Sequence, residues 1–312
     1  MTILGLDVVS LIVMLISAST PILLAATGEL VAEKSGVLNL GVEGMMIMGA
    51  IAGFAAAVTT GSPAAGYGIA ALAGAAMAMI FAFLTQVLLA NQVASGLALT
   101  LFGLGLSALI GQPYNGIKPP AMGAPPLGAL TDLPGVGPIL FSHDWMVYVS
   151  LALLAGVWAF LRTRPGLILR AVGENPEAAH ALGYRVVAIR VAALAFGGAM
   201  AGLGGAYLSL VRVPQWAQGM TAGAGWIALA IVVFAGWRPG GILLGAYLFG
   251  GVTVLQLRLQ AAGFAIPVQI LSMAPYLVTI AVLVIISARQ TRGGSNGGAA
   301  PAALGRPFHA SR

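Results

Sequence analysis

The sequence contains no cysteine, and this absence excludes disulfides, thiolate metal sites and thiol nucleophiles together. Histidine is scarce as well, because the chain has only His143, His180 and His309, which lie far apart. No Ser/His/Asp arrangement and no phosphate-binding G-x-x-x-x-G-K-[ST] motif is present. We therefore expect neither an enzyme nor a cofactor on this chain, and any ATP must be hydrolysed on another chain.

Charged residues make up only 7% of the 312 residues, whereas soluble domains contain about 25%. Hydrophobic residues make up 59%, and the mean hydropathy is +0.99. Apolar runs long enough to cross a bilayer, about 20 residues, recur along the chain. They do not alternate with a period of two, so helices rather than a barrel must satisfy the backbone in lipid. The predicted fold class is an all-α polytopic membrane protein.

Charges and Pro/Gly positions divide the chain into nine predicted transmembrane helices. They lie near 6–28, 37–59, 65–89, 93–111, 145–161, 190–211, 222–236, 240–259 and 267–287. The first run lacks a basic flank and a cleavage site, so we expect a helix rather than a signal peptide. Helices one to four and six to nine would have opposite topology, which predicts inverted four-helix repeats of the kind that transporters contain.

Residues 1–292 form the predicted transmembrane domain, and the basic residues predict its orientation in the membrane. With the C-terminus inside, eleven of the fourteen basic residues face the cytoplasm, and Lys118, Arg212 and Arg258 face outward. The positive-inside rule then places the N-terminus outside, and it explains the net charge of +6 without nucleic acid. The proline-rich loop 112–144 would be extracellular, the loop 162–189 cytoplasmic, and the Gly/Ala-rich tail 293–312 disordered.

The stretch GENPEAAHALGYR, residues 173–185, is a polar island in the predicted cytoplasmic loop. Asn175 is a good N-cap, Pro176 suits the first helical position, and Gly183 suits the position after the last turn. These residues predict a helix over 176–182. Such a short helix is marginal in water, so it must pack on something. Two interpretations remain open: a helix lying on its own protein, and a docking helix for a soluble partner.

The stretch SGVLNLGVEGMM, residues 35–46, predicts a discontinuous helix. Gly36, Gly41 and Gly44 interrupt the start of the second apolar run, and each glycine costs about 1 kcal/mol of helix stability relative to alanine. Asn39 and Glu43 are four residues apart and would share a helix face. A carboxylate at this depth must face protein or water. The two residues either hold the backbone freed at the break or line a substrate path.

Both stretches resemble the permease subunits of ABC importers in the ribose, branched-chain amino acid and nucleoside group. The polar island is similar to their cytoplasmic coupling loop, and 20–46 resembles the shorter permease of nucleoside importers. The resemblance implies a type II importer-like fold in a bacterial inner membrane. It implies as partners an ATP-binding subunit carrying ATP and magnesium, a longer permease and a substrate-binding lipoprotein.

The same resemblance assigns roles to residues. Contacts that couple the chain to the partner ATPase fall on Arg170, Gly173, Glu174, Asn175, Pro176, Glu177, Ala178, Ala179 and Gly183. The translocation path falls on Asn39, Gly41, Glu43, Gly44 and Trp226. Charge-poor walls suit a neutral polar solute, and a nucleoside is expected first. A simple sugar, an ion-coupled carrier using Glu43 and, last, a membrane-embedded enzyme remain as alternatives.

Overall fold

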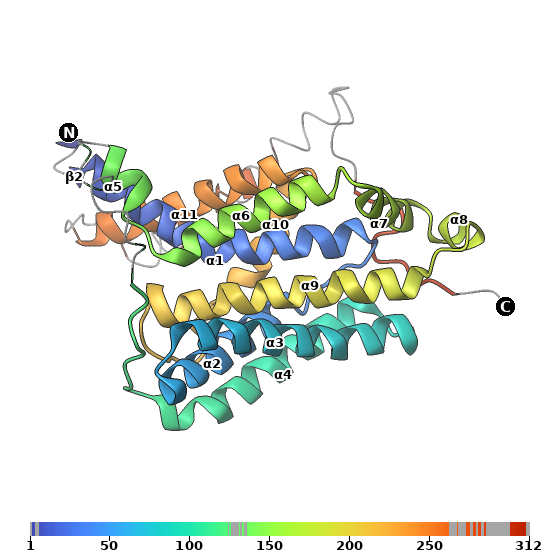
Figure 1. The fold of residues 1–312 in the computed structure, drawn as a ribbon, viewed down its shortest axis with the longest axis horizontal. Coiled ribbons are helices and arrows are strands. Elements are labelled where there is room, and N and C mark those ends of the chain that lie inside the picture. Colours follow the sequence, from blue (N-terminus) through green and yellow to red (C-terminus); the bar gives the residue numbers. More distant parts are fainter. Residues whose placement is uncertain are drawn as a thin grey trace.

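The structure is a computed structural model in which most of the chain is described. The described residues are 2–3, 6–123, 125, 131, 133, 136–261 and 300–309, with isolated positions between 267 and 284. They form an almost entirely helical molecule, in which the long helices run side by side (Figure 1). Beside the helices there is one two-stranded antiparallel pair, β1 (Thr2–Ile3) and β2 (Leu6–Asp7), near the N-terminus.

Eleven α-helices lie within the described residues. They are α1 (Val8–Lys34), α2 (Val42–Thr60), α3 (Pro63–Ala82), α4 (Gln92–Gly111), α5 (Val136–Phe141), α6 (Trp145–Phe160), α7 (Arg164–Glu174), α8 (Pro176–Ala181), α9 (Val186–Tyr207), α10 (Ala224–Phe234) and α11 (Pro239–Ala261). Helices α3 and α9 continue into π-helical turns, η1 (Phe83–Val87) and η4 (Leu208–Arg212), and α4 continues into a 3-10 turn, η2 (Gln112–Tyr114).

Six of the described helices are long and apolar enough to cross a membrane, or seven segments if one bent pair counts as a span. The six are α1, α2, α3 with η1, α4 with η2, α9 with η4, and α11. The bent pair is α6 and α7, which meet at 77°. The prediction of nine spans is therefore not confirmed. The predicted span 222–236 contains only the 11-residue helix α10, and 267–287 lies largely outside the described residues.

Helix α1 lies at the centre of the molecule, where residues 18–33 are buried without interruption. It packs against α9 and α11 and also contacts α10 and α6, while α2 and α3 cover the other side of α9. Neither α1 nor α9 presents one polar face, because each is surrounded by other helices over most of its length. This pattern is typical of inner helices in a membrane bundle, since a helix that is apolar all round is buried or lies in lipid.

Glycines allow α9 to approach its neighbours very closely. A Cβ added at Gly74 of α3 would overlap the carbonyl oxygen of Gly198 in α9, and one added at Gly49 of α2 would overlap the Cα of Gly202. Small residues at helix interfaces let backbones come into direct contact in membrane proteins. The small residues of α9 therefore form two close helix–helix contacts. Gly198 and Gly202 make a glycine seam with Gly74 of α3, and Gly202 makes a second seam with Gly49 of α2.

The two ends of the long axis carry different structures. The N-terminus and α5 lie at one end, and α7 and α8 lie at the other (Figure 1). The predicted extracellular loop 112–144 contains the turn η2 and the short helix α5, and residues 124, 126–130, 132 and 134–135 are outside the described part. The inverted four-helix repeats are not confirmed.

The prediction of a disordered tail is wrong for residues 300–309. This segment forms hydrogen bonds with three other parts of the chain, and its Ala303 and Phe308 are only 4% and 5% exposed. The remaining tail residues, 293–299 and 310–312, lie outside the described part. Gly and Ala alone would not order this segment, so its order depends on the tertiary contacts described below.

Candidate functional site

The predicted break between the first two spans is present and covers residues 35–41, from the end of α1 to the start of α2. The amides of Ser35, Gly36 and Val37 still donate to carbonyl oxygens in the last turns of α1, whereas further along the break side chains bind the backbone. The amide side chain of Gln92 accepts a 2.8 Å hydrogen bond from Leu38 N, and Thr100 Oγ1 donates 3.1 Å to Leu40 O. Both side chains belong to α4, which therefore holds the break in place.

Asn39 is fully buried at the middle of this break. Its Nδ2 donates to Glu29 Oε2 of α1 at 3.2 Å, and its Oδ1 accepts from Gly41 N at the same distance. Glu29 also accepts from the backbone N of Asn39 at 3.3 Å. These contacts match the first interpretation made from the sequence, in which Asn39 secures the freed backbone. No solute reaches its amide in this conformation, because the side chain is enclosed.

Glu43, in the first turn of α2, connects this break to a second one, residues 213–223 between η4 and α10. Its Oε1 accepts hydrogen bonds from Thr221 Oγ1 at 2.5 Å and Gly223 N at 2.9 Å. Its Oε2 accepts from Gly225 N at 2.7 Å. Those donors form the N-terminal end of α10, where backbone N–H groups are free to bind an anion. One carboxylate thus lies at the positive ends of both α2 and α10, an arrangement that the helix dipoles stabilise.

Glycines make this connection possible. A Cβ on Gly225 would lie 2.7 Å from the backbone of Glu43, and one on Gly44 would lie 2.7 Å from Leu99 O of α4. Gly223, the residue before α10, has a φ of +85°, which favours glycine. The backbones of the two breaks therefore lie very close together. Glu43 and Gly225 are 182 residues apart in the sequence, so sequence analysis does not reveal this pairing.

Trp226 differs from the other predicted path residues because its side chain is 45% exposed. Its Nε1 donates a 3.4 Å hydrogen bond to Leu40 O of the first break. Asn39 is fully buried and Glu43 is 3% exposed, while Gly41 and Gly44 are buried between helices. Among the five, only Trp226 has a side chain accessible for contact with a solute.

Two further acids of α1 are buried rather than solvated at the predicted membrane boundary. Glu29 binds Asn39, and Glu33 accepts a hydrogen bond from Trp237 Nε1 through its Oε2. The structure shows that these acids are hydrogen-bonded inside the protein, with neutral donors in place of cations.

The predicted helix of the polar island is confirmed as α8, Pro176–Ala181. Asn175 caps it, because its Oδ1 accepts a 2.9 Å hydrogen bond from Ala178 N. At the other end Gly183 has a φ of +89°, and Tyr184 N returns to Ala179 O at 3.1 Å. The sequence did not predict α7, which precedes α8 directly and is joined to it by Asn175.

The nine predicted coupling residues divide into two groups. Gly173, Pro176 and Ala179 are buried against this chain, and Arg170 is partly buried, with a buried Nε that has no hydrogen-bond partner among the described residues. The others, Glu174, Asn175, Glu177, Ala178 and Gly183, are exposed. The helix therefore lies on its own protein with one face and exposes the other, and docking of a soluble partner on the exposed face stays a prediction.

Leu182 was missed by sequence reasoning, although it directly follows α8. Its side chain is 77% exposed, more than any other large apolar side chain that the structure describes. Leucines with similar exposure, such as Leu101 and Leu244, belong to apolar helices that can face lipid. Leu182 stands in a polar loop, so lipid does not account for it.

The loop with α8 is in direct contact with the first break. A Cβ added at Gly173 would overlap the carbonyl oxygen of Lys34 and lie 3.1 Å from Gly36 N. Gly36 has a φ of +87°, so glycine is favoured on both sides of this crossing. The end of α7 is therefore packed directly against the start of residues 35–41.

A separate apolar cavity of about 650 Å³ lies between α1, α6, α7 and α9. Its lining includes Val31, Phe160, Ile189 and Phe196, and Tyr184 provides the only hydroxyl group. It does not include Glu43 or Trp226. An apolar cavity of this kind does not match a polar solute, so we do not assign it to a translocation path.

Within the described residues, apolar helices, two breaks meeting at a carboxylate and an exposed loop helix define a polytopic membrane transport protein. The chain belongs to the family described as branched-chain amino acid transport system / permease component, whose profile matches residues 11–287. It is a permease subunit rather than an enzyme.

Three relatives cover most of this chain. A provisionally named glucose ABC transporter permease, TsgC13, of Haloferax volcanii is 44% identical over 86% of this chain and 88% of its own length. The nucleoside ABC transporter permease NupC of Lactococcus lactis is 33% identical over 86% and 89%. The guanosine ABC transporter permease NupQ of Bacillus subtilis is 30% identical over 94% and 98%. No solved structure matches the chain.

Proposed function

We propose that this chain is the shorter of two permease subunits in an ABC importer for a neutral, hydroxyl-bearing solute. The observation that carries the proposal is the position of α8, which is followed by the exposed Leu182 and is joined through Asn175 to α7, whose end at Gly173 packs on the first break. Closure of a partner ATP-binding subunit would move α8, and Gly173 would transmit the movement to residues 35–41. The path would then open on the other side of the membrane.

The orientation follows from the same proposal, with α8 inside the cell, the N-terminus outside and the C-terminus inside. ATP and magnesium would bind the partner subunit, and a substrate-binding lipoprotein would deliver solute at the opposite end. The natural absence of cysteine gives a direct test. A single Leu182→Cys substitution should react with a membrane-impermeant maleimide only after the bacterial inner membrane has been permeabilised. Labelling of intact cells would reverse the proposed orientation.

Docking of the ATP-binding subunit can be tested at the same residue. Leu182→Asp places a charge in the apolar contact and should abolish copurification of that subunit, whereas Leu182→Met keeps the contact apolar and should retain it. Leu182 packs on no other part of the described chain closely enough to be buried, so both variants should melt like the wild type. If Leu182→Asp copurifies normally, α8 is not the docking helix.

Nucleoside is our first candidate for the solute, supported by the names of two relatives that align with most of this chain. A simple sugar is the second, supported by a relative with the higher identity of 44%. Trp226 suits both, because an indole ring can stack on a base or on the apolar face of a sugar. Uptake of radiolabelled guanosine and glucose by the reconstituted transporter, each in competition with the other, decides between them. If the transporter takes up neither labelled compound, both candidates are excluded.

A further inference from the structure

The C-terminal segment 300–309 lies against the loop that carries α8. Ala303 N donates a 2.9 Å hydrogen bond to Gly173 O at the end of α7, and Gly305 N donates 3.2 Å to Gly36 O in the first break. Ala302 N donates 3.2 Å to Glu174 Oε2. These three contacts join the segment to two parts of the chain, at Gly36 and at Gly173–Glu174, that are more than 130 residues apart in the sequence.

Arg190, near the start of α9, strengthens this connection from inside. Its side chain is fully buried. Nε donates to Ser35 O at 3.1 Å, and Nη1 donates to Arg306 O at 3.2 Å. A buried guanidinium is costly unless it is hydrogen-bonded. The C-terminal segment therefore supplies an acceptor that the buried Arg190 uses, in addition to the one supplied by the first break.

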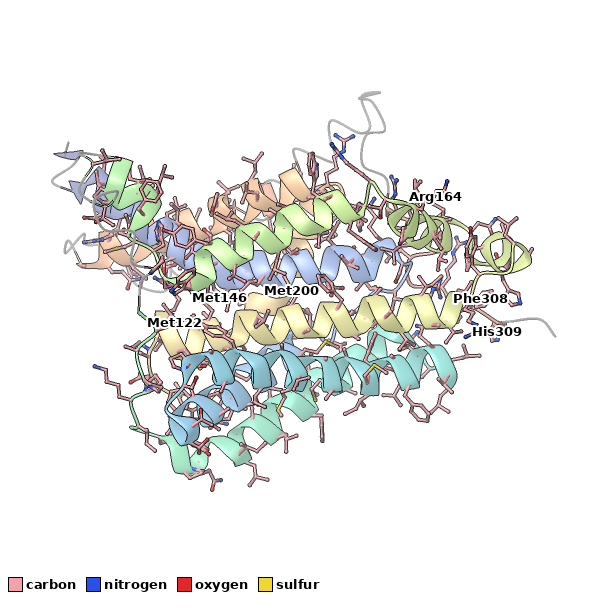
Figure 2. All side chains as sticks on the ribbon, in the orientation of Figure 1. Met122, Met146, Arg164, Met200, Phe308 and His309 are labelled. Atoms are coloured by element: carbon pink, nitrogen blue, oxygen red, sulfur yellow. The ribbon has the colours of Figure 1, made fainter. Side chains whose placement is uncertain are left out.

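Phe308 anchors the end of the segment to α8 itself. It is 5% exposed and clusters with Val172 of α7, Ala179 of α8 and Val186 of α9. Its ring also meets that of His180 edge to face, with 5.6 Å between centroids. Figure 2 shows Phe308 and His309 at the end of the molecule that carries α8.

Helix α8 depends on such contacts because it has only six residues. Helices of this length are not stable by themselves in water. Only Pro176 and Ala179 of α8 are buried, and both are small. Phe308 has the largest side chain in the cluster that covers Ala179, so it supplies much of the surface on which the helix rests.

We propose that residues 302–308 form a brace that positions α8 and links its movement to the first break. The proposal rests on the docking role of α8 given under Proposed function. It adds a second connection between α8 and the first break, beside the one that Gly173 makes. Phe308 and the backbone of residues 302–306 are positioning groups in this view, since they need not touch the solute or the partner.

The test uses the complete transporter, with both permeases and the ATP-binding subunit, in proteoliposomes. The changed chains are a truncation after residue 299 and the single variant Phe308→Ala. His309→Ala is the matched control, because it removes the exposed ring next to Phe308. Copurification of the ATP-binding subunit, ATP hydrolysis and uptake of labelled solute are measured on the same preparation. Phe308→Leu, which keeps an apolar side chain in the cluster, tests for rescue.

We expect both changed chains to retain the ATP-binding subunit while solute uptake per ATP hydrolysed falls by about tenfold, a common size for coupling between two sites. His309→Ala should keep the wild-type ratio, and Phe308→Leu should recover most of it. An unchanged ratio in the truncated chain would overturn the brace. If the truncation does not assemble, the ratio measured for Phe308→Ala decides alone. Failure of docking itself is recognised separately, because Leu182→Asp would then copurify normally.

Discussion

Replacing Glu43 should separate the two breaks that its carboxylate holds together. In Glu43→Ala the donors Thr221 Oγ1, Gly223 N and Gly225 N lose their acceptor. A buried donor left without a partner costs about 1–3 kcal/mol, so three of them correspond to a loss of stability of at least about 3 kcal/mol. Glu43→Gln keeps an acceptor oxygen for Thr221 and Gly223 but turns its NH₂ toward Gly225 N, and should cost about 1–3 kcal/mol.

The assay is thermal unfolding of the purified subunit in detergent, compared with uptake by the reconstituted transporter. A change of 1 kcal/mol shifts the melting temperature by about 2–4 °C in a protein of this size class. Glu43→Ala should therefore melt about 6 °C or more below the wild type, with Glu43→Gln between them. Thr59→Ala is a control on the same helix, because its exposed hydroxyl binds only carbonyls of α2. It should change stability by less than about 0.5 kcal/mol.

The order of the variants tests the reasoning more sharply than any single value. If Glu43→Ala melts within about 2 °C of the wild type, the carboxylate does not hold the breaks together. If uptake is lost while the melting temperature is unchanged, Glu43 acts on the solute instead, as the second interpretation of the sequence allowed. A loss of both, in the order alanine, glutamine, wild type, is the result that we expect.

Three other substitutions have defined outcomes. Gly74→Ala should lower the melting temperature by the equivalent of about 1–3 kcal/mol, because its methyl group overlaps the carbonyl oxygen of Gly198, whereas Gly68→Ala on the same helix meets nothing within 4 Å and should not. Trp226→Ala should reduce uptake while shifting melting less than Glu43→Ala does, since the indole is 45% exposed and makes one weak hydrogen bond. Arg190→Met should destabilise the protein by about 1–3 kcal/mol, measured by melting, because the buried carbonyl group of Ser35 and the partly buried one of Arg306 lose their donor.

Local sequence chemistry predicted the parts of the site that local contacts determine. The cap at Asn175, the left-handed Gly183 and the break at 35–41 are all present where the sequence placed them. Each depends on residues within a few positions of one another, so turn and cap preferences are sufficient. The apolar runs, for their part, correctly indicated six described spans as apolar helices.

Tertiary contacts determine the features that the sequence did not reveal. The partners of Glu43 are about 180 residues away, 178 in the case of Thr221, and nothing in a single sequence connects them. The composition of 300–309 suggests disorder, yet Gly36 and Gly173 bind its backbone. Hydropathy predicted a full span over 222–236, but only 11 residues there are helical. The glycines before Ala224 form the end of the second break, where α10 begins late.

The glycine seam between α3 and α9 restricts how this protein can change shape. Hydrogen atoms are all that Gly74, Gly198 and Gly202 can place between the two backbones, since added carbons would overlap the facing chain. The residues next to these glycines include Ala73, Ala199 and Leu203, whose side chains would have to enter that space if one helix slid along the other by a single residue. We therefore expect the two helices to move together as one rigid body during a transport cycle, with any bending confined to the ends of helices, beside residues 35–41 and 213–223.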